Sequence, residues 1–562
     1  MSSSKMLLLT APIPKAVAFL SVIITGIGCL MPITTKNFSV VEAAAYDATW
    51  ESLDTRPLPT WYDEAKIGIF VHWGVFSVPA FQSEWFWYYW EGPQDPDKKT
   101  NNKFEKFIQQ TEKPGFAYAD YAQRFDASLW DPDYWADVFA KSGAQYVVLT
   151  SKHHEGFCNW DSSTMVGTTW NWNSVQVGPR RDLVGDLAAA IRNSSVVSKQ
   201  TKKPLKFGLY HSLYEWFNPL FLQDVMHNLT TQSFVDLKTM PELYHLVETY
   251  RPEIIWSDGD WDASSDYWKA KEFLAWLATN SSVKDTVVWN DRWGTDATCK
   301  HGSYLTCTDR YVPNNISETK YENCMTLDKG SWGFNRQANV EDYFSTKELV
   351  DEVVKTVARN GNILINVGPA ADGTISPIMT DRLLGLGDWL TVNGQAIYNT
   401  RYWGVCDQDL NFDVFYTRDD DLLYVHLTKW PSDNRVPLVC PETSEATKAY
   451  ILGIGPNDDG ENEIGNVKVL RHDAQASSTT AASTTSANAT TGTRGGRSNS
   501  TLSTDNQNLS QPSVTLELPN LNPGQVPCQH VWVVVLTAIR NLDENDDDND
   551  GGDGEVEVEE TS

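Results

Sequence analysis

The stretch Arg251-Pro-Glu-Ile-Ile-Trp-Ser-Asp-Gly-Asp-Trp261 joins a short apolar segment to a turn. The apolar residues 254–256 predict a buried strand, and the turn residues 257–260 end it. Asp258 is therefore expected at the carboxyl end of a strand, the end that carries the chemistry in barrels of alternating strands and helices. Taken alone, the stretch fits an ordinary loop carboxylate equally well, because Asp before Gly is a common turn signal.

Similar strand ends recur along the chain. Near-continuous apolar runs begin near residues 67, 145, 206, 253, 286 and 362, and segments with helical spacing cover 131–142, 181–193, 238–250, 264–279, 347–359 and 380–391. Apolar runs of this kind are typical of a parallel sheet that is buried on both faces. The sequence therefore predicts an α/β fold, a (β/α)8-like TIM barrel over residues 46–392 with eight or fewer strand–helix units. The long aromatic segment 77–130 is predicted to be an irregular functional loop.

The pattern changes after about residue 395. Short alternating segments at 413–418, 422–427, 513–518 and 531–536 predict a C-terminal antiparallel β-sandwich over residues 393–540. Within it, residues 474–512 are rich in Ser, Thr, Asn and Gly, which predicts a disordered insertion. Residues 541–562 hold eleven acidic and no basic residues and predict a disordered tail.

The N-terminus predicts export. Lys5 and Lys15 precede an apolar run over residues 16–33, and small residues follow up to Ala45. Residues 1–45 are interpreted as a secretory signal peptide, with an uncleaved signal anchor as the alternative that would place the chain on a membrane. The net charge of −29 argues against a nucleic-acid partner, because binding phosphates needs a basic patch.

Cysteines and sequons agree with the secretory route. Seven cysteines follow Cys29, so at least one stays unpaired within the chain, and Cys299 lies close enough to Cys307 to bridge a loop. No common zinc spacing is present. Sequons occur at Asn37, Asn193, Asn228, Asn280, Asn315, Asn488, Asn499 and Asn508. The predicted location is the secretory pathway.

In a barrel, the strand ends meet at one mouth. They would bring together His72, His153, His154, Tyr210, His211, Asp258, Asp291 and Arg292. Polar groups among tryptophans, of which the chain has 23, suit a polyhydroxylated ligand whose hydroxyls need partners and whose flat face stacks on rings.

Two other kinds of site are disfavoured. A metal site is one, because His153 and His154 are adjacent and would point to opposite faces of a strand. A Ser257 nucleophile is the other, because the residue lacks a Gly-X-Ser-X-Gly setting. No metal is therefore expected.

Cleavage of a glycosidic bond needs two carboxylates. Asp258 is the first candidate. Chain position leaves four candidates for the second, and each also fits a solvated loop carboxylate: Asp260, Asp291, Asp309 and Glu322. The last two are expected in an irregular stretch after the fifth strand.

A series of motifs, in order, resembles the family 29 glycoside hydrolases, the α-L-fucosidases. They are Phe70-Val-His-Trp-Gly-Val-Phe-Ser-Val-Pro, Thr150-Ser-Lys-His-His-Glu-Gly-Phe, Asp182-Leu-Val-Gly-Asp-Leu, Gly208-Leu-Tyr-His-Ser-Leu, Trp256-Ser-Asp-Gly-Asp-Trp, Asn290-Asp-Arg-Trp-Gly, Ser331-Trp-Gly-Phe and Asn362-Ile-Leu-Ile-Asn-Val-Gly-Pro. The resemblance covers residues 46–470 and 513–540 and is greatest to the lysosomal-type animal enzymes. Within the secretory pathway it implies the lysosome or vacuole, or the extracellular space. The Ser/Thr-rich insertion and the acidic tail depart from the family pattern without touching these motifs.

The resemblance implies a retaining exo-hydrolase that removes terminal α-L-fucose from glycoproteins, glycolipids or oligosaccharides without a cofactor. It implies that Asp258 is the nucleophile and that Asp309 is the favoured acid/base, with Glu322 as the alternative. The implied substrate-binding residues are His72, Glu84, Trp85, His153, His154, Tyr210 or His211, and Arg292.

The rival interpretation from another class is a catalytically inactive fucose-binding lectin on the same scaffold. The presence of Asp258 argues against it, because such a lectin would lack the nucleophile. A retaining hydrolase for a sugar of related shape is a second rival. The sequence leaves open the fucosyl linkage and the oligomeric state, including a homo-oligomer.

Overall fold

The computed structural model describes residues 45–92, 102–164, 171–193, 195–409, 413–455, 465–472 and 512–542. The predicted signal segment 1–45, insertion 474–512 and acidic tail 541–562 lie outside these residues, apart from their boundary positions. Within the described ranges, no helix combines the length and the apolar character needed to span a lipid bilayer.

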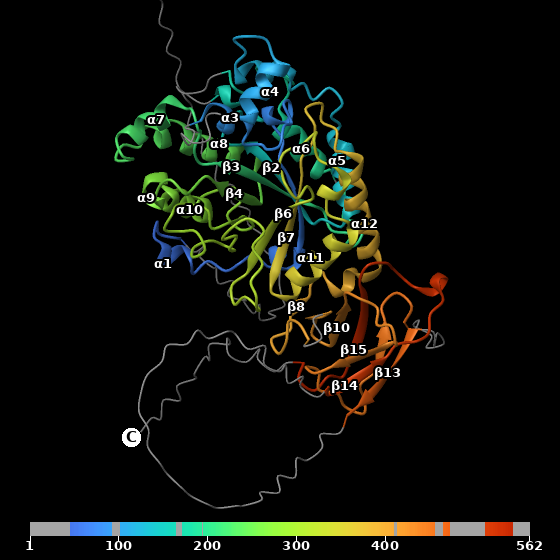
Figure 1. Ribbon diagram of the computed structural model, residues 1–562. Helices are drawn as coiled ribbons and strands as arrows, with labels where there is room; N and C mark the ends of the chain where they lie inside the picture. Colours follow the sequence, from blue (N-terminus) through green and yellow to red (C-terminus); the bar gives the residue numbers. More distant parts are fainter. Residues whose placement is uncertain are drawn as a thin grey trace, which may run out of the picture. The chain divides into compact units, whose positions relative to one another are not determined.

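A curled parallel sheet forms the centre of the N-terminal part (Figure 1). Its seven strands are β1 (Ile67–Val71), β2 (Tyr146–Lys152), β3 (Lys206–Ser212), β4 (Ile254–Asp258), β5 (Val288–Trp289), β6 (Tyr321–Thr326) and β7 (Gly361–Val367), in the order β5-β4-β3-β2-β1-β7-β6. All are fully buried apart from Lys206 at the start of β3. The predicted TIM-like fold is thereby confirmed.

The segment 303–305 spans the gap between the two edge strands β5 and β6. The Ser303 N–H donates to the Trp289 carbonyl at 3.0 Å, and the Leu305 carbonyl accepts from the Glu322 N–H at 2.8 Å. Leu305 and Tyr321 form a parallel bridge. These three residues thus connect the two edge strands by backbone contacts, which a complete strand provides in an eight-stranded barrel.

Helices cover the outside of the sheet (Figure 1). The main ones are α5 (Pro132–Ser142), α6 (Leu183–Ile191), α8 (Met240–Tyr250), α10 (Ala270–Thr279), α11 (Thr346–Ala358) and α12 (Pro377–Asn393). Their starts follow from sequence, since the Asp131 carboxylate caps α5, Asp182 caps α6, and Ser345 forms a capping box with Glu348 on α11. The predicted helix 264–279 is instead two helices, α9 (Ser265–Trp268) and α10, because Lys269 between them is left-handed with φ 51°.

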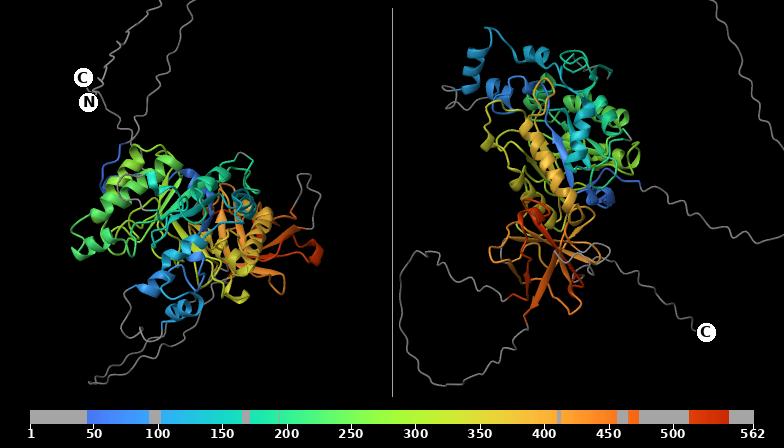
Figure 2. Two further views of the ribbon diagram at one scale, coloured as in Figure 1. Left: turned by 90° about the horizontal axis from the view of Figure 1, so that it is seen from above. Right: turned by 90° about the vertical axis from the view of Figure 1, so that its right-hand side faces the viewer.

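Two expectations for the barrel were wrong. The segment 77–130 contains helices α3 (Phe86–Glu91) and α4 (Lys103–Thr111), which are blue at the periphery of the barrel in both views of Figure 2. A 3-10 helix follows at 118–124. Glu322 lies on strand β6 and not in an irregular stretch, because polar side chains of Tyr321–Thr326 are accommodated inside the barrel. The remaining short helices are α1 (Trp50–Leu53), α2 (Thr60–Ala65) and α7 (Pro219–Met226).

The C-terminal part is an antiparallel sheet that folds back on itself. Its strands are β8 (Arg401–Tyr402), β9 (Val414–Arg418), β10 (Leu422–Leu427), β11 (Arg435–Leu438), β12 (Ala449–Ile451), β13 (Asn466–Arg471), β14 (Val514–Glu517) and β15 (Trp532–Thr537). Strand β13 pairs with β12 through residues 466–467 and with β14 through residues 468–471. One apolar core receives side chains from both halves, as in a sandwich.

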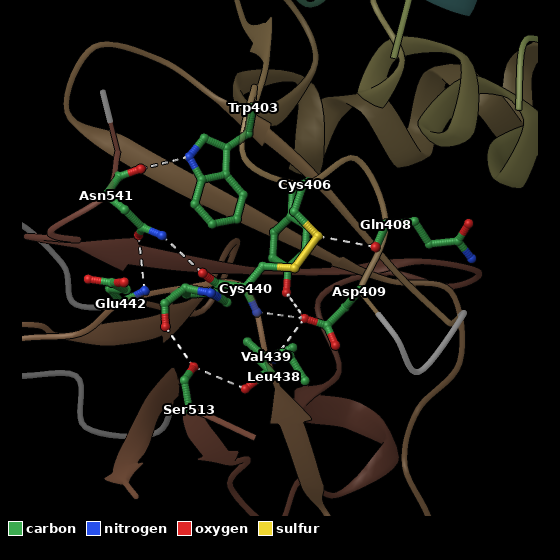
Figure 3. Close-up of a disulfide and its surroundings, with 12 residues drawn as sticks. Trp403, Cys406, Gln408, Asp409, Leu438, Val439, Cys440, Glu442, Ser513 and Asn541 are labelled. Atoms are coloured by element: carbon green, nitrogen blue, oxygen red, sulfur yellow. Dashed lines mark hydrogen bonds between the residues drawn. A yellow bond between two sulfur atoms is a disulfide. The ribbon is translucent and has the colours of Figure 1, made fainter. Parts of the chain in front are cut away.

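A disulfide between Cys406 and Cys440 joins the entry to this sheet with the end of β11 (Figure 3). Asp409 beside it accepts the Val439 N–H at 2.9 Å, and the Asn541 side chain donates to the Cys440 carbonyl at 3.0 Å. The second disulfide joins Cys299 to Cys307, a pairing that their short spacing allows and that the sequence left open. Cys158, Cys324 and Cys528 are free.

Candidate active site

A cavity of about 510 Å3, here called the barrel cavity, opens at the carboxyl ends of the barrel strands. It is lined by Phe70, His72, Ser83, Glu84, Trp85, Tyr89, His153, His154, Tyr210, Trp256, Asp258, Trp261, Arg292, Asp309, Arg310, Lys329, Gly330 and Trp332. All predicted binding residues except His211 line it, together with Asp258 and Asp309. The structure thus brings together residues that lie more than 200 positions apart in the chain.

Asp258, the last residue of β4, is held by three neighbours. The Tyr210 hydroxyl donates to its Oδ2 at 2.7 Å, and Arg292 Nη1 donates to its Oδ1 at 3.1 Å. His154 Nε2 lies 3.5 Å from Oδ2. The carboxylate is fixed in orientation, yet 12% of the side chain is still exposed to the cavity. An oriented, accessible carboxylate is what nucleophilic attack requires.

Arg292 links two of the carboxylates that line the cavity, Asp258 and Asp309. While Nη1 contacts Asp258, Nη2 donates to Asp309 Oδ1 at 2.7 Å. The guanidinium carbon lies 4.7 Å from the centre of the Trp256 ring, and Nε donates to Thr306 Oγ1 at 3.1 Å. Burial lowers the pKa of Arg292, but Asp309, Cys324 and Asp258 together outweigh that effect, and the pKa is raised overall.

The four candidates for the second carboxylate lie in different surroundings. Asp309 borders the cavity with 49% of its side chain exposed. Asp260 is buried beside Thr298, and Asp291 accepts the backbone N–H groups of Cys299 and Cys307 at 2.8 and 3.0 Å. Asp291 therefore organises the disulfide loop. Of the four, Asp309 alone combines a place in the cavity with access to solvent.

Glu322 lies inside the barrel and has no exposed surface. The hydroxyls of Tyr62 and Tyr146 donate to its Oε2 at 2.8 and 2.7 Å, and Trp256 Nε1 donates to Oε1 at 2.9 Å. Burial raises the pKa of Glu322 to about 6. That pKa would suit a general acid, but its two oxygens face the tyrosines and Trp256, and no substrate can reach them without rearrangement.

The histidine pair differs from what the sequence predicted. His153 and His154 both line the barrel cavity, with ring centres 4.1 Å apart. The expectation that they point to opposite faces was wrong, because β2 ends at Lys152 and strand alternation no longer applies. Burial lowers the pKa of His154 well below its usual value, and it lowers the pKa of His72 likewise. Both rings are therefore neutral and able to donate as well as accept hydrogen bonds.

His211 lies outside the cavity, in a buried group that we call the ion network. It consists of Lys152, His211, Glu215, Lys238 and Glu242. Tyr210 and His211 are adjacent on β3 and point to opposite faces. The inward residue contacts Asp258, and the outward one lies 3.3 Å from Glu242 of helix α8. Of the two, Tyr210 lines the barrel cavity and His211 does not.

The segment before α3 supplies one wall of the cavity. Glu84 Oε2 accepts the Trp332 N–H at 3.0 Å and the Gly333 N–H at 3.3 Å, which fixes the loop after β6. Trp85 lies 6.0 Å from Trp261, ring centre to ring centre, in a stacked arrangement. Lys329 and Trp332 of that loop were missed as site residues. The Ser331-Trp-Gly-Phe motif was the available signal, but nothing in it says that the side chains face a cavity.

Within the described part of the chain, no group of three or more His, Cys, Asp or Glu side chains has an arrangement that could hold a metal ion. The cavity offers hydrogen-bonding groups, three carboxylates and aromatic rings. These are the components for recognising a sugar and cleaving its glycosidic bond.

The family profile described as "Alpha-L-fucosidase" matches residues 33–395, well over half of the chain. The chain belongs to the α-L-fucosidase family. Tissue alpha-L-fucosidase of Rattus norvegicus is 48% identical over 409 residues, covering 73% of this chain and 84% of the relative. Tissue alpha-L-fucosidase of Homo sapiens is 41% identical over 495 residues, covering 88% of this chain and 92% of the relative.

Solved structures agree with this assignment. The crystal structure of Thermotoga maritima alpha-fucosidase in complex with fucose aligns with a TM-score of 0.63 at 27% identity, covering 88% of this chain and 100% of that chain. The enzyme is therefore a glycoside hydrolase that acts on α-L-fucosides. The lectin interpretation finds no support in these similarities.

Proposed function

We propose that the enzyme is a retaining exo-hydrolase that releases terminal α-L-fucose through a covalent fucosyl-enzyme intermediate. The observation that carries this proposal is the pair of carboxylates, Asp258 and Asp309, bound to one guanidinium at the mouth of the barrel. A shared guanidinium favours the short separation of retaining enzymes, about 5–5.5 Å, over the about 6.5–9.5 Å of inverting ones.

In the first step, an Asp258 oxygen attacks the anomeric carbon and the glycosidic C–O bond breaks. Asp309, in its protonated form, gives its proton to the departing oxygen. In the second step, the Asp309 carboxylate takes a proton from water, the water oxygen attacks the anomeric carbon, and the ester to Asp258 breaks. Tyr210 and Arg292 orient Asp258 in both steps.

Six polar side chains of the cavity, one of them Arg292, would bind the sugar hydroxyls. These are His72, Glu84, Trp85, His153, His154 and Arg292. One corner is apolar, since the Phe70 and Trp332 rings lie 6.1 Å apart, centre to centre. This corner fits the C6 methyl group that distinguishes fucose from galactose, because an apolar substituent gains by leaving water. An L-galactoside, with a hydroxyl there, should be the poorer substrate.

The disulfides and the exposed sequons support a protein of the secretory pathway. The glycan substrate would then be met in a lysosome, in a vacuole or outside the cell. The two disulfides favour an oxidising compartment during folding. The sequon asparagines within the described residues are all exposed: Asn193, Asn228, Asn280 and Asn315. We propose that these carry glycans.

The deciding experiment compares the wild type with Asp258→Ala on nitrophenyl α-L-fucoside. The wild type should release nitrophenol, the variant should lose this activity, and added azide should restore part of it by occupying the space of the missing carboxylate. A β-fucosyl azide product would establish the retaining course. Full activity in Asp258→Ala would overturn the proposal.

A further inference from the structure

A second cleft, on the antiparallel sheet, has the composition of a sugar-binding site. This sandwich cleft has a volume of about 380 Å3 and is lined by Trp430, Asn434, Asn520, Leu521, Pro523, Val526 and Trp532. Its lining comes from two connections, the one between β10 and β11 and the one between β14 and β15, together with the first residue of β15. Its volume is within the range of small-ligand sites, about 300–1,000 Å3.

Two indole rings form adjoining walls. The Trp430 and Trp532 rings stand nearly perpendicular, at 81°, with their centres 5.4 Å apart. Each indole N–H is used internally, since Trp430 Nε1 donates to Asn434 Oδ1 at 2.9 Å and Trp532 Nε1 donates to the Cys528 carbonyl at 3.1 Å. These bonds fix both rings, so their apolar faces are in place before a ligand arrives.

Two amides provide the polar side of the cleft. Asn434 Nδ2 donates to Asn520 Oδ1 at 2.6 Å, and the Asn434 backbone is held in a left-handed conformation with φ 57°. This bond orients the Asn520 amide, whose Nδ2 makes no hydrogen bond to the described residues. An oriented amide with a free N–H is suited to a hydroxyl or an acetamido carbonyl.

The lining also excludes other ligand classes. None of its seven residues is charged, although the chain as a whole carries a net charge of −29. A charged ligand would lose hydration without gaining a partner. A neutral ligand with flat apolar faces and hydroxyl groups fits, and that description is a sugar ring.

We propose that the sandwich cleft binds neutral sugar residues of the glycan that carries the fucose, at a site separate from the barrel cavity. The inference rests on the glycan substrate of the proposed function, but not on its mechanism. A second contact with the same glycan or glycoprotein would raise the local concentration of fucosyl ends at the barrel cavity, because the second binding event becomes intramolecular.

A direct test measures binding of a desialylated N-glycan without fucose by calorimetry, in the presence of saturating L-fucose to occupy the barrel cavity. The wild type should bind, and Trp430→Ala should weaken binding about tenfold, as expected for the loss of one indole wall. Asn520→Ala provides a second variant at an exposed position, should Trp430→Ala fold poorly. Tyr134→Ala removes an exposed aromatic ring on α5 and should bind as the wild type does.

A kinetic test uses the ratio of kcat/KM on a fucosylated glycoprotein to kcat/KM on nitrophenyl α-L-fucoside. This ratio should fall severalfold in Trp430→Ala and stay constant in Tyr134→Ala. A wild type that does not bind the glycan, or binding that survives in both cleft variants, would overturn the inference. So would a wild type that binds a neutral apolar peptide in place of the glycan. A wild type that has no activity on nitrophenyl α-L-fucoside, in contrast, would contradict the proposed function and leave the binding test of the sandwich cleft unaffected.

Discussion

The barrel cavity and the ion network lie on opposite sides of strands β2 and β3, and they use their charges in different ways. In the network, Lys152 Nζ contacts Glu215 at 3.0 Å and Glu242 at 2.6 Å, and all three side chains are buried. In the cavity, Asp258 is partly exposed and Asp309 about half exposed. Charges that pair fully within the protein hold strand ends in place, whereas charges left partly free can act on a substrate.

The pKa directions show the same contrast. Burial alone would lower the pKa of Lys152, but Glu215 and Glu242 raise it overall. Burial would raise the pKa of Glu242, but Lys152 and Lys238 lower it overall. Lys152 and Glu242 are thus kept charged by their partners, whereas burial lowers the pKa of His211 to about 4 and leaves its ring neutral. Substitutions in the cavity should therefore mainly lower activity, and substitutions of the buried charged and polar groups should mainly lower stability.

Asp309→Ala should have the largest effect. A positioned acid/base contributes about 10²–10⁴-fold, so kcat/KM on a fucosyl disaccharide should fall by that factor. The loss should be smaller on nitrophenyl fucoside, whose leaving group needs little protonation. The matched control is Glu322→Gln, which keeps the volume of a carboxyl that is enclosed in the barrel. If the control shows the leaving-group dependence and Asp309→Ala does not, the acid/base is Glu322.

Lys152→Met should destabilise the fold by about 3–5 kcal/mol, because it leaves two buried carboxylates with one lysine. Urea unfolding measures this free energy. Lys141→Met is the control, since Lys141 contacts Asp137 at 2.6 Å with both side chains about half exposed. That pair should contribute about 0–1 kcal/mol. Equal losses in the two variants would remove the distinction between the network and the surface pairs.

Tyr210→Phe removes the hydrogen bond to Asp258 and should lower kcat/KM by about 10–100-fold, as expected for a bond of about 1.5–3 kcal/mol to a charged group. Tyr146→Phe is the matched control, because its hydroxyl donates to Glu322 at 2.7 Å. The control should lose stability in thermal unfolding with no comparable loss of activity. An equal loss of activity in both variants would mean that Glu322 acts on the substrate.

The pH dependence of stability should reveal the buried Glu322. Its pKa is about 6 in the fold against 4.5 unperturbed, so the native state binds this proton more tightly than the unfolded state. The stabilisation is fully present below pH 4.5 and is lost as the pH rises through about 6, by up to about 2 kcal/mol. The free energy of unfolding in urea, measured at pH 5 and at pH 7, should therefore lack this pH-dependent contribution in Glu322→Gln. A pH dependence shared by the variant would assign the effect to other groups.

The barrel was predictable where burial makes strands continuously apolar. Strands β1 to β4 and β7 follow that rule, and short β5 does too. Strand β6 does not, because its inward side chains include Glu322, which the tyrosines and Trp256 satisfy by hydrogen bonds. The local sequence pattern around Glu322 does not reveal its hydrogen-bond partners, because they lie on distant parts of the chain. The same limit applies to the loop after β6, which Glu84 fixes from about 250 residues away.

The site was predictable as a set of strand ends, but not in the orientation of each side chain. The register between β2 and β3 is irregular between Thr150 and Lys152, so Lys152 contacts Glu242 of helix α8 on the outer side. The two histidines that follow lie beyond the end of β2, and both enter the cavity. Apolar periodicity gives no warning of a register irregularity or of the residue at which strand alternation ends.

The junction between helix α12 and the last part of the antiparallel sheet has a consequence for biosynthesis. Trp389 Nε1 donates to the Val531 carbonyl at 2.8 Å across 142 residues, and the Val531 side chain belongs to the core of the barrel. At ribosomal rates of about 5–20 residues per second, the helix emerges roughly 7–30 s before its partner. For that interval the barrel core lacks Val531, so the core is completed only after most of the antiparallel sheet has been synthesised.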